Sequence, residues 1–188
     1  IGPGMMGHAI AQEFATAGHD VILCGRSAER LEQALEKIEQ SLNELAQWDL
    51  ISDKEISPAL QRLQTTTDLK VAASDTDLIV ESVVEILEIK EDLFSELDTI
   101  SPDRTIFASN TSSLLPTTLA AATQRPDRFL NLHYFNPPYL MPLVEIVRGE
   151  KTSDEAVNAV FHLMQAIGKS PIICQKEAPG FIVNRFPL

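Results

Sequence analysis

The chain has 188 residues, of which 44% are hydrophobic and 22% charged, a balance typical of a globular protein with a substantial core. Its formal net charge of −12 argues against nucleic acid or an anionic membrane surface as the main partner, because both attract cationic surfaces. The two cysteines form no CxxC pattern, and no apolar run approaches the roughly 18 residues of a membrane span, so we expect a reduced, cytoplasmic protein.

Short apolar runs alternate with helical patterns along the chain. We predict strands at 21–24, 78–83, 105–109, 128–135, 143–147 and 171–174. We predict helices at 6–17, 27–46, 89–97 and 154–167, the second capped by Ser27. This alternation indicates an α/β fold with a doubly wound, mainly parallel sheet. Residues 37–66 are polar and helical with a break at 49–53, so we expect them to project from the sheet.

The chain opens with glycines in G-x-G-x-x-G spacing, Gly2, Gly4 and Gly7, followed by a predicted helix and a strand. Gly2 would allow the tight turn, Gly4 would let the backbone approach a pyrophosphate, and Gly7 would let the helix pack closely. Met5 and Met6, at the start of the helix, would present free amide groups to the phosphates. This context predicts a Rossmann dinucleotide site. The strand expected before the turn is almost entirely missing, and we expect the chain to be a fragment.

The strand at 21–24 does not end in the Asp or Glu that holds a ribose 2′-hydroxyl in NAD-binding proteins. Gly25 stands there, followed by Arg26. A small residue would leave room for a 2′-phosphate and a guanidinium would suit it, which predicts that NADP is tolerated or preferred. The alternative is that Arg26 is solvated and lies over the adenine.

His133 and Glu145 are the polar residues of the stretch HYFNPPYLMPLVEIV. Removing a hydride from a carbon requires the hydroxyl proton to leave too, and histidine is the side chain best suited to accept it. An ionised carboxylate beside the imidazole would favour its charged form and fix its tautomer. We therefore predict a general base and the residue that orients it.

Together with the glycine turn, the motifs SNTSS (109–113), HYFNPP (133–138) and PGFIVNR (179–185) make the chain resemble the L-3-hydroxyacyl-CoA (3-hydroxybutyryl-CoA) dehydrogenase family, in its N-terminal NAD-binding domain. The resemblance implies that His133 and Glu145 are catalytic. It implies that Ser112 and Asn184 hydrogen-bond the substrate oxygen or the histidine, and that Ser112 also lies at the cofactor. The further cofactor contacts that it implies are Glu85, Lys90, Asn110 and Asn136.

The resemblance also implies that residues 1–180 form the Rossmann domain, that 37–66 belong to its projecting helical hairpin, and that 181–188 begin a C-terminal helical domain through which the protein forms a homodimer. The activity implied is the interconversion of an L-3-hydroxyacyl-CoA and its 3-keto form with NAD, in fatty acid metabolism and without a metal. Two alternatives stay open. One is a dehydrogenase of a small free hydroxy acid, of the gulonate or carnitine type, because few cations stand in the projecting segment. The other is a cofactor-binding protein without turnover.

Overall fold

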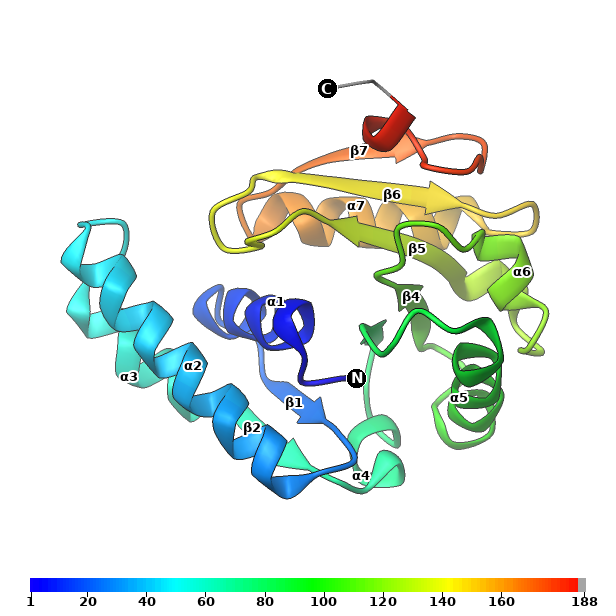
Figure 1. Cartoon of the computed structure of the whole chain (residues 1–188). Coiled ribbons are helices and arrows are strands. Elements are labelled where there is room, and N and C mark those ends of the chain that lie inside the picture. The colour runs from blue at the N-terminus through cyan, green and yellow to red at the C-terminus, as the bar shows by residue number, and fades with distance from the viewer. Residues whose placement is uncertain (186–188) are drawn as a thin grey trace.

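Figure 1 shows the computed structural model of the chain, which describes residues 1–185. The predicted start of a second domain at 181–188 therefore lies partly outside the described residues. The strands in the described range are β1 (Val21–Cys24), β2 (Leu63–Thr66), β3 (Leu78–Glu81), β4 (Ile106–Ser109), β5 (Phe129–Tyr134), β6 (Leu143–Arg148) and β7 (Ser170–Cys174). β1 pairs with β2, and the others form a sheet in the order β3-β4-β5-β6-β7. All of these pairs are parallel except β5–β6.

The glycine turn connects these two sheets. The backbone nitrogen of Ile1 donates to the carbonyl of Val80 at 2.7 Å, and the Ser82 amide donates to the Ile1 carbonyl at 2.8 Å. On the other side, the Gly2 amide donates to the Cys24 carbonyl at 2.8 Å. The turn is thereby fixed between the carboxyl ends of β1 and β3, the edge at which open α/β sheets bind ligands.

Helices cover both faces of the sheet. They are α1 (Met5–Thr16), α2 (Ala28–Gln47), α3 (Asp53–Gln61), α4 (Leu69–Ala73), α5 (Leu87–Ile100), α6 (Pro116–Ala120) and α7 (Asp154–Ala166), with 3₁₀ turns at Pro126–Arg128 and Val183–Arg185. α1 and α7 share one apolar core with β4, β5 and β6, whereas α4, α5 and α6 share another with β3, β4 and β5. Leu130 and Leu132 enter the first core and Phe129 the second, as the alternation of side chains along a strand requires. The predicted doubly wound fold is confirmed.

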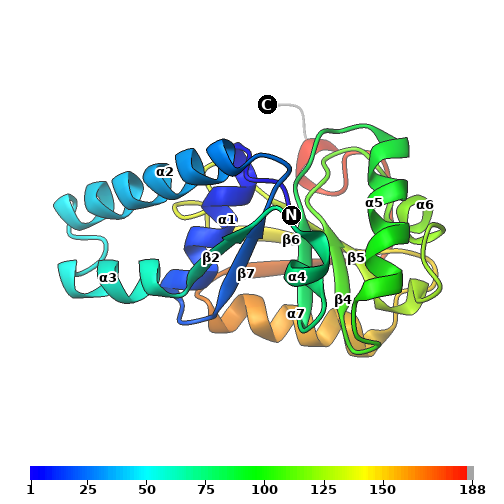
Figure 2. The same ribbon diagram turned by 90° about the horizontal axis from the view of Figure 1, so that it is seen from below.

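α2 and α3 form a hairpin that projects from the sheet, as Figures 1 and 2 show. Ser27 caps α2, as predicted, because its hydroxyl accepts from the Arg30 amide at 3.3 Å. The inner half of the hairpin packs Leu31 and Ala34 against Ala11 and Ala15 of α1. At the tip, Trp48 is exposed. Among residues 1–185, no helix is long and apolar enough to cross a membrane.

The prediction that residues 37–66 are helical is wrong at its end, because Leu63–Thr66 is strand β2. It pairs in parallel with β1, from Val21 opposite Leu63 to Cys24 opposite Thr66. Only Leu63 in it is buried, so this edge strand lacks the apolar run that marks the other strands. α4 and α6 were also not predicted, since five residues are too few to show a helical period. The six predicted strands and four predicted helices are confirmed, with ends shifted by a few residues.

Candidate active site

His133 and Glu145 lie directly opposite each other in the antiparallel pair β5–β6. His133 Nδ1 donates to Glu145 Oε2 at 2.6 Å. The two residues are 4% and 0% exposed, so the pair is shielded from water. Twelve residues of sequence separate them, and the hairpin register brings them together.

Backbone amides complete the surroundings of the carboxylate. Glu145 Oε1 accepts from the amides of Ile182 at 2.9 Å and Val183 at 2.8 Å. Phe135 and Phe181 place their rings 4.7 Å and 5.3 Å from the imidazole, measured between centroids. Sequence reasoning missed the amides at 182 and 183, because their approach depends on how residues 178–183 cross β6. Burial and then the charge of Glu145 raise the pKa of the nearby Cys174 thiol to about 11.

Ser112 approaches the other nitrogen of the imidazole. Its Oγ lies 3.1 Å from His133 Nε2. Asn110 fixes the start of this loop between β3 and β5. Its backbone N–H donates to the Glu81 carbonyl at 2.8 Å, and its side-chain Oδ1 accepts from the Tyr134 backbone N–H at 3.0 Å. The structure thus brings Ser112, His133 and Glu145 into one hydrogen-bonded row.

A cluster of charges, buried at Lys90 and Glu81 and exposed at Glu85, lies behind the Ser112 loop. Lys90 of α5, which is 1% exposed, lies with its Nζ 2.6 Å from Glu81 Oε1 and 3.2 Å from Glu85 Oε2. Glu81 also accepts from the Ser109 hydroxyl at 2.6 Å and the Val83 amide at 2.6 Å. Sequence reasoning missed Glu81, although a lone carboxylate in an apolar strand was a signal. The Lys90 ammonium is fully enclosed, so any influence on a nucleotide must pass through its carboxylate partners.

Glu85 carries this cluster to the loop of Ser112. Its Oε1 accepts from the Thr111 hydroxyl and from the Ser113 hydroxyl, the latter at 2.8 Å. Burial acts to raise the pKa of Glu85, but the hydrogen bonds from Thr111 and Ser113 and the charge of Lys90 outweigh it and lower the pKa overall. The Thr111 hydroxyl in turn accepts from the Ser113 and Leu114 amides, so Glu85 fixes the backbone on both sides of Ser112.

Each glycine of the turn has a different environment. Gly2 has φ +97°, and a Cβ there would lie 2.6 Å from the Ser82 carbonyl oxygen. A Cβ on Gly7 would lie 1.8 Å from the Gly2 carbonyl oxygen. A Cβ on Gly4 would meet nothing within 4 Å. Gly2 and Gly7 are therefore required by the packing of the chain itself, whereas Gly4 faces open space at the start of α1.

Gly25, at the end of β1, is small for a reason that the sequence did not reveal. Gly25 is buried, and a Cβ on it would lie 2.6 Å from Cδ of Pro3 and 2.7 Å from its Cγ. The small residue is required by the glycine turn that packs against it. Arg26 is exposed, and within residues 1–185 its guanidinium forms no ion pair.

The other predicted site residues are less tightly placed. Met5 is 67% exposed and Met6 half-buried, at the first turn of α1. Asn136 and Asn184 are exposed, and among residues 1–185 neither side chain has a hydrogen-bond partner. Asn184 directly follows Val183, whose amide binds Glu145, so its backbone lies at the site. In the described part of the chain, no group of three or more His, Cys, Asp or Glu side chains is arranged to hold a metal ion.

The arrangement can perform proton transfer. A carboxylate has no proton to donate, so Nδ1 of His133 carries the hydrogen that it shares with Glu145. In the neutral ring Nε2 then has a free lone pair, which lies on the side of Ser112. The His133–Glu145 pair lies towards the carboxyl end of β5, close to the Ser112 loop.

Residues 1–178 match the family model described as 3-hydroxyacyl-CoA dehydrogenase, NAD binding domain. The chain is 43% identical over 98% of its length to hydroxyacyl-coenzyme A dehydrogenase, mitochondrial, of Sus scrofa, of which it covers 60%. It is 40% identical over 98% of its length to 3-hydroxybutyryl-CoA dehydrogenase of Clostridioides difficile, of which it covers 65%.

A crystal structure of 3-hydroxybutyryl-CoA dehydrogenase from Escherichia coli superposes on 98% of the chain with a TM-score of 0.94 and 38% identity. The chain covers 39% of that protein, so it spans between 39% and 65% of the length of these three proteins. On this likeness in sequence and in structure, the chain belongs to the family of 3-hydroxyacyl-CoA dehydrogenase NAD-binding domains.

Proposed function

We propose that the protein to which this chain belongs oxidises the 3-hydroxyl group of an L-3-hydroxyacyl-CoA to a ketone, and catalyses the reverse reduction. The observation that carries the proposal is the row Ser112, His133 and Glu145 at the carboxyl edge of the sheet, in which His133 and Glu145 are buried. The relatives named above, which share this domain, are hydroxyacyl-CoA and 3-hydroxybutyryl-CoA dehydrogenases.

In this proposal His133 takes the hydroxyl proton. The Nδ1–H bond to Glu145 keeps Nε2 available as the acceptor, and the ionised carboxylate stabilises the imidazolium that forms. Ser112 Oγ, 3.1 Å from Nε2, donates a hydrogen bond to the substrate oxygen or to the ring. The nicotinamide dinucleotide supplies the hydride acceptor when it is bound. The hydrogen on the carbinol carbon leaves as a hydride with both electrons of its bond, and the hydroxyl proton passes to Nε2. The ketone thus forms with atoms and electrons in balance.

The glycine turn fits the dinucleotide. Gly4 caps α1 without a side-chain hydrogen bond, and the first turn of α1 carries no acidic residue. The first amides of a helix have no partner within it, and they attract phosphate. The open space at Gly4 lets a pyrophosphate approach these amides. In this arrangement Met5, Met6 and Gly7 contribute backbone groups, and Glu85, Asn110 and Asn136 line the path towards His133.

The proposal is tested by incubating the full-length protein with acetoacetyl-CoA and NADH and monitoring the loss of NADH absorbance. We expect turnover by the unmodified protein. We expect His133→Gln to abolish turnover while NADH still binds. Binding of NADH with no turnover of any hydroxy or keto substrate would instead identify a cofactor-binding protein without activity.

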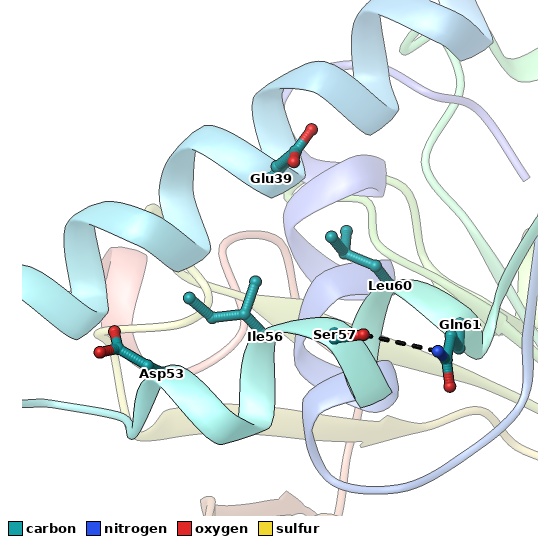
Figure 3. A pocket seen from close by; sticks show the side chains of 6 residues that line it. All are labelled: Glu39, Asp53, Ile56, Ser57, Leu60 and Gln61. Carbon is teal, nitrogen blue, oxygen red and sulfur yellow. Dashed lines mark hydrogen bonds between the residues drawn. The ribbon is translucent and has the colours of Figure 1, made fainter.

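A dehydrogenase of a small free hydroxy acid is the second candidate, and the charge of the projecting hairpin favours it. Figure 3 shows the groove between α2 and α3, to which α2 contributes Glu39 and α3 contributes Asp53, Ile56, Ser57, Leu60 and Gln61. Two carboxylates line this groove and no cation does, so it repels the phosphates of coenzyme A. Comparing acetoacetyl-CoA with free acetoacetate in the assay above separates the two candidates.

We further propose that residues 1–180 act as the dinucleotide-binding domain and that 181–188 lead into a helical domain that closes the site and forms a homodimer. The share of the relatives covered by the chain supports a further domain in the complete protein.

The cytoplasm is our proposed location, although the relative from Sus scrofa is mitochondrial by name. The proposed partner is a small molecule, and not nucleic acid or a membrane. Sedimentation of the full-length protein measures its oligomeric state.

A further inference from the structure

We infer that the end of β1 forms a subsite for the 2′-phosphate of NADP(H), with Arg26 as the residue that recognises it. The inference rests on the proposed dinucleotide function and specifies which of the two nicotinamide dinucleotides the site selects. In dinucleotide-binding domains, an acidic residue at the end of the second strand binds the ribose hydroxyls and repels a 2′-phosphate, whereas a nearby arginine accepts that phosphate.

The acidic residue is absent here for a structural reason. Gly25 occupies its position, and any side chain on Gly25 would collide with the Pro3 ring, as the 2.6 Å and 2.7 Å approaches show. Pro3 cannot withdraw easily, because it stands between Gly2, which is hydrogen-bonded to Cys24, and the start of α1. The choice of proline in the turn and the loss of the carboxylate at the end of β1 are therefore linked.

Arg26 stands immediately beside this contact. The Gly25 amide is anchored to the Thr66 carbonyl at 3.2 Å, so the backbone that leads to Arg26 is fixed next to the glycine turn. The guanidinium is exposed and, within residues 1–185, unpaired, which leaves its donors available to a phosphate. A planar guanidinium binds phosphate through two parallel hydrogen bonds.

Two carboxylates on the neighbouring elements, Asp68 and Glu29, already have hydrogen-bond partners of their own. Asp68, which lies after β2, is used as the N-cap of α4, where its Oδ1 accepts from the Lys70 amide at 2.8 Å and the Val71 amide at 3.3 Å. Glu29 in the first turn of α2 accepts from the Gln33 side chain at 3.4 Å. Arg30, in the first turn of α2, is a second exposed cation four residues from Arg26.

The test compares the binding of adenosine 2′,5′-bisphosphate (2′,5′-ADP) and 5′-AMP to the full-length protein by titration calorimetry, since these nucleotides differ only in the 2′-phosphate. We expect 2′,5′-ADP to bind at least tenfold more tightly. We expect Arg26→Ala to remove most of that difference while leaving 5′-AMP affinity within about twofold. The gain should shrink as salt is raised, because it is electrostatic.

Lys151→Ala is the matched control. Lys151 is exposed and follows β6, whose end lies at the opposite edge of the sheet because β6 runs antiparallel to β5, so its removal changes the net charge equally without touching the subsite. Equal affinity of the unmodified protein for both nucleotides would overturn the inference while leaving the dinucleotide site intact. A preference that survives Arg26→Ala would overturn the role of Arg26. Failure to bind either nucleotide would count against the proposed function itself. If the inference holds, kcat/KM of the unmodified protein should be higher with NADPH than with NADH, and Arg26→Ala should reduce this difference.

Discussion

The β5–β6 hairpin and the α2–α3 hairpin are both antiparallel excursions of the chain, but they are stabilised in opposite ways. In β5–β6, His133 and Glu145 are buried, and each carboxylate oxygen of Glu145 has a partner from β5 or from residues 182–183. In α2–α3, apolar side chains pack into a core shared with α1, whereas polar side chains form local contacts, as in the capping box of Ser52 and Glu55. The two carboxylates of the groove, Glu39 and Asp53, are exposed. Substitutions should therefore act strongly on chemistry in the first hairpin and weakly on binding in the second.

The largest effect is expected at His133. His133→Gln should lower kcat by about 100- to 10,000-fold, because positioned acid–base groups contribute on that scale. The affinity for NADH, measured by fluorescence titration, should stay unchanged, since the dinucleotide contacts come from the glycine turn. His162→Gln, at an exposed position on α7, is the control. A variant that retains near-normal turnover would exclude His133 as the base.

Glu145→Gln should have the next largest effect. It replaces a charge-assisted hydrogen bond worth about 1.5–3 kcal/mol by a neutral one. The difference between the two, about 1–1.5 kcal/mol in the transition state, corresponds to a rate that is about 5- to 12-fold lower. The pH at which ketone reduction falls to half should also decrease, because the imidazolium is no longer stabilised by a carboxylate. Glu150→Gln, exposed in the turn that follows β6, should change neither quantity; an unmoved pH profile for Glu145→Gln would argue against the pairing.

Glu85→Gln should have a smaller effect, on both rate and stability. Loosening of the Ser112 loop should reduce kcat a few-fold, by about 0.5–1.5 kcal/mol per neutral hydrogen bond. Because the pKa of Glu85 is lower in the folded than in the unfolded chain, the carboxylate stabilises the fold above its unfolded-state pKa, and this stabilisation is lost as the pH falls through the folded-state pKa. Urea unfolding between neutral and acid pH should therefore show a weaker acid dependence for Glu85→Gln than for Glu88→Gln. Identical curves for the two variants would contradict this.

The smallest effect is expected in the groove of the α2–α3 hairpin. If coenzyme A lies there, Glu39→Gln should lower KM for acetoacetyl-CoA up to about fivefold, the range of an exposed charge interaction of about 0.2–1 kcal/mol. kcat and the KM for a free keto acid should not change. No change in either KM would show that no substrate phosphate approaches Glu39, and would sharpen the distinction between the two hairpins.

Much of the fold and of the site could be predicted from sequence, for reasons that differ from residue to residue. The strands that carry His133 and Glu145 are apolar and well delimited, so their positions followed from the pattern, whereas their antiparallel register was not predicted. β2 could not be predicted, because it is a polar edge strand stabilised by its ladder with β1. The Glu81–Lys90 pair and the Pro3–Gly25 contact could not be predicted either, since each joins elements whose distance only the folded chain determines.

The register of β5 and β6 fixes the contact between His133 and Glu145 independently of the side chains in the loop that joins the two strands. The ladder from Leu130–Arg148 to Tyr134–Val144 aligns the base with its carboxylate, whatever the chain does beyond it. The loop from 135 to 142 is attached at one main point outside the ladder, where Lys169 Nζ donates to the carbonyls of Pro138 at 2.6 Å and Met141 at 2.9 Å. Both acceptors are backbone atoms, so the side chains of this loop, including the exposed Leu140, can be exchanged without loss of that anchor. The side chains of this loop can thus change while the alignment of His133 with Glu145 is retained.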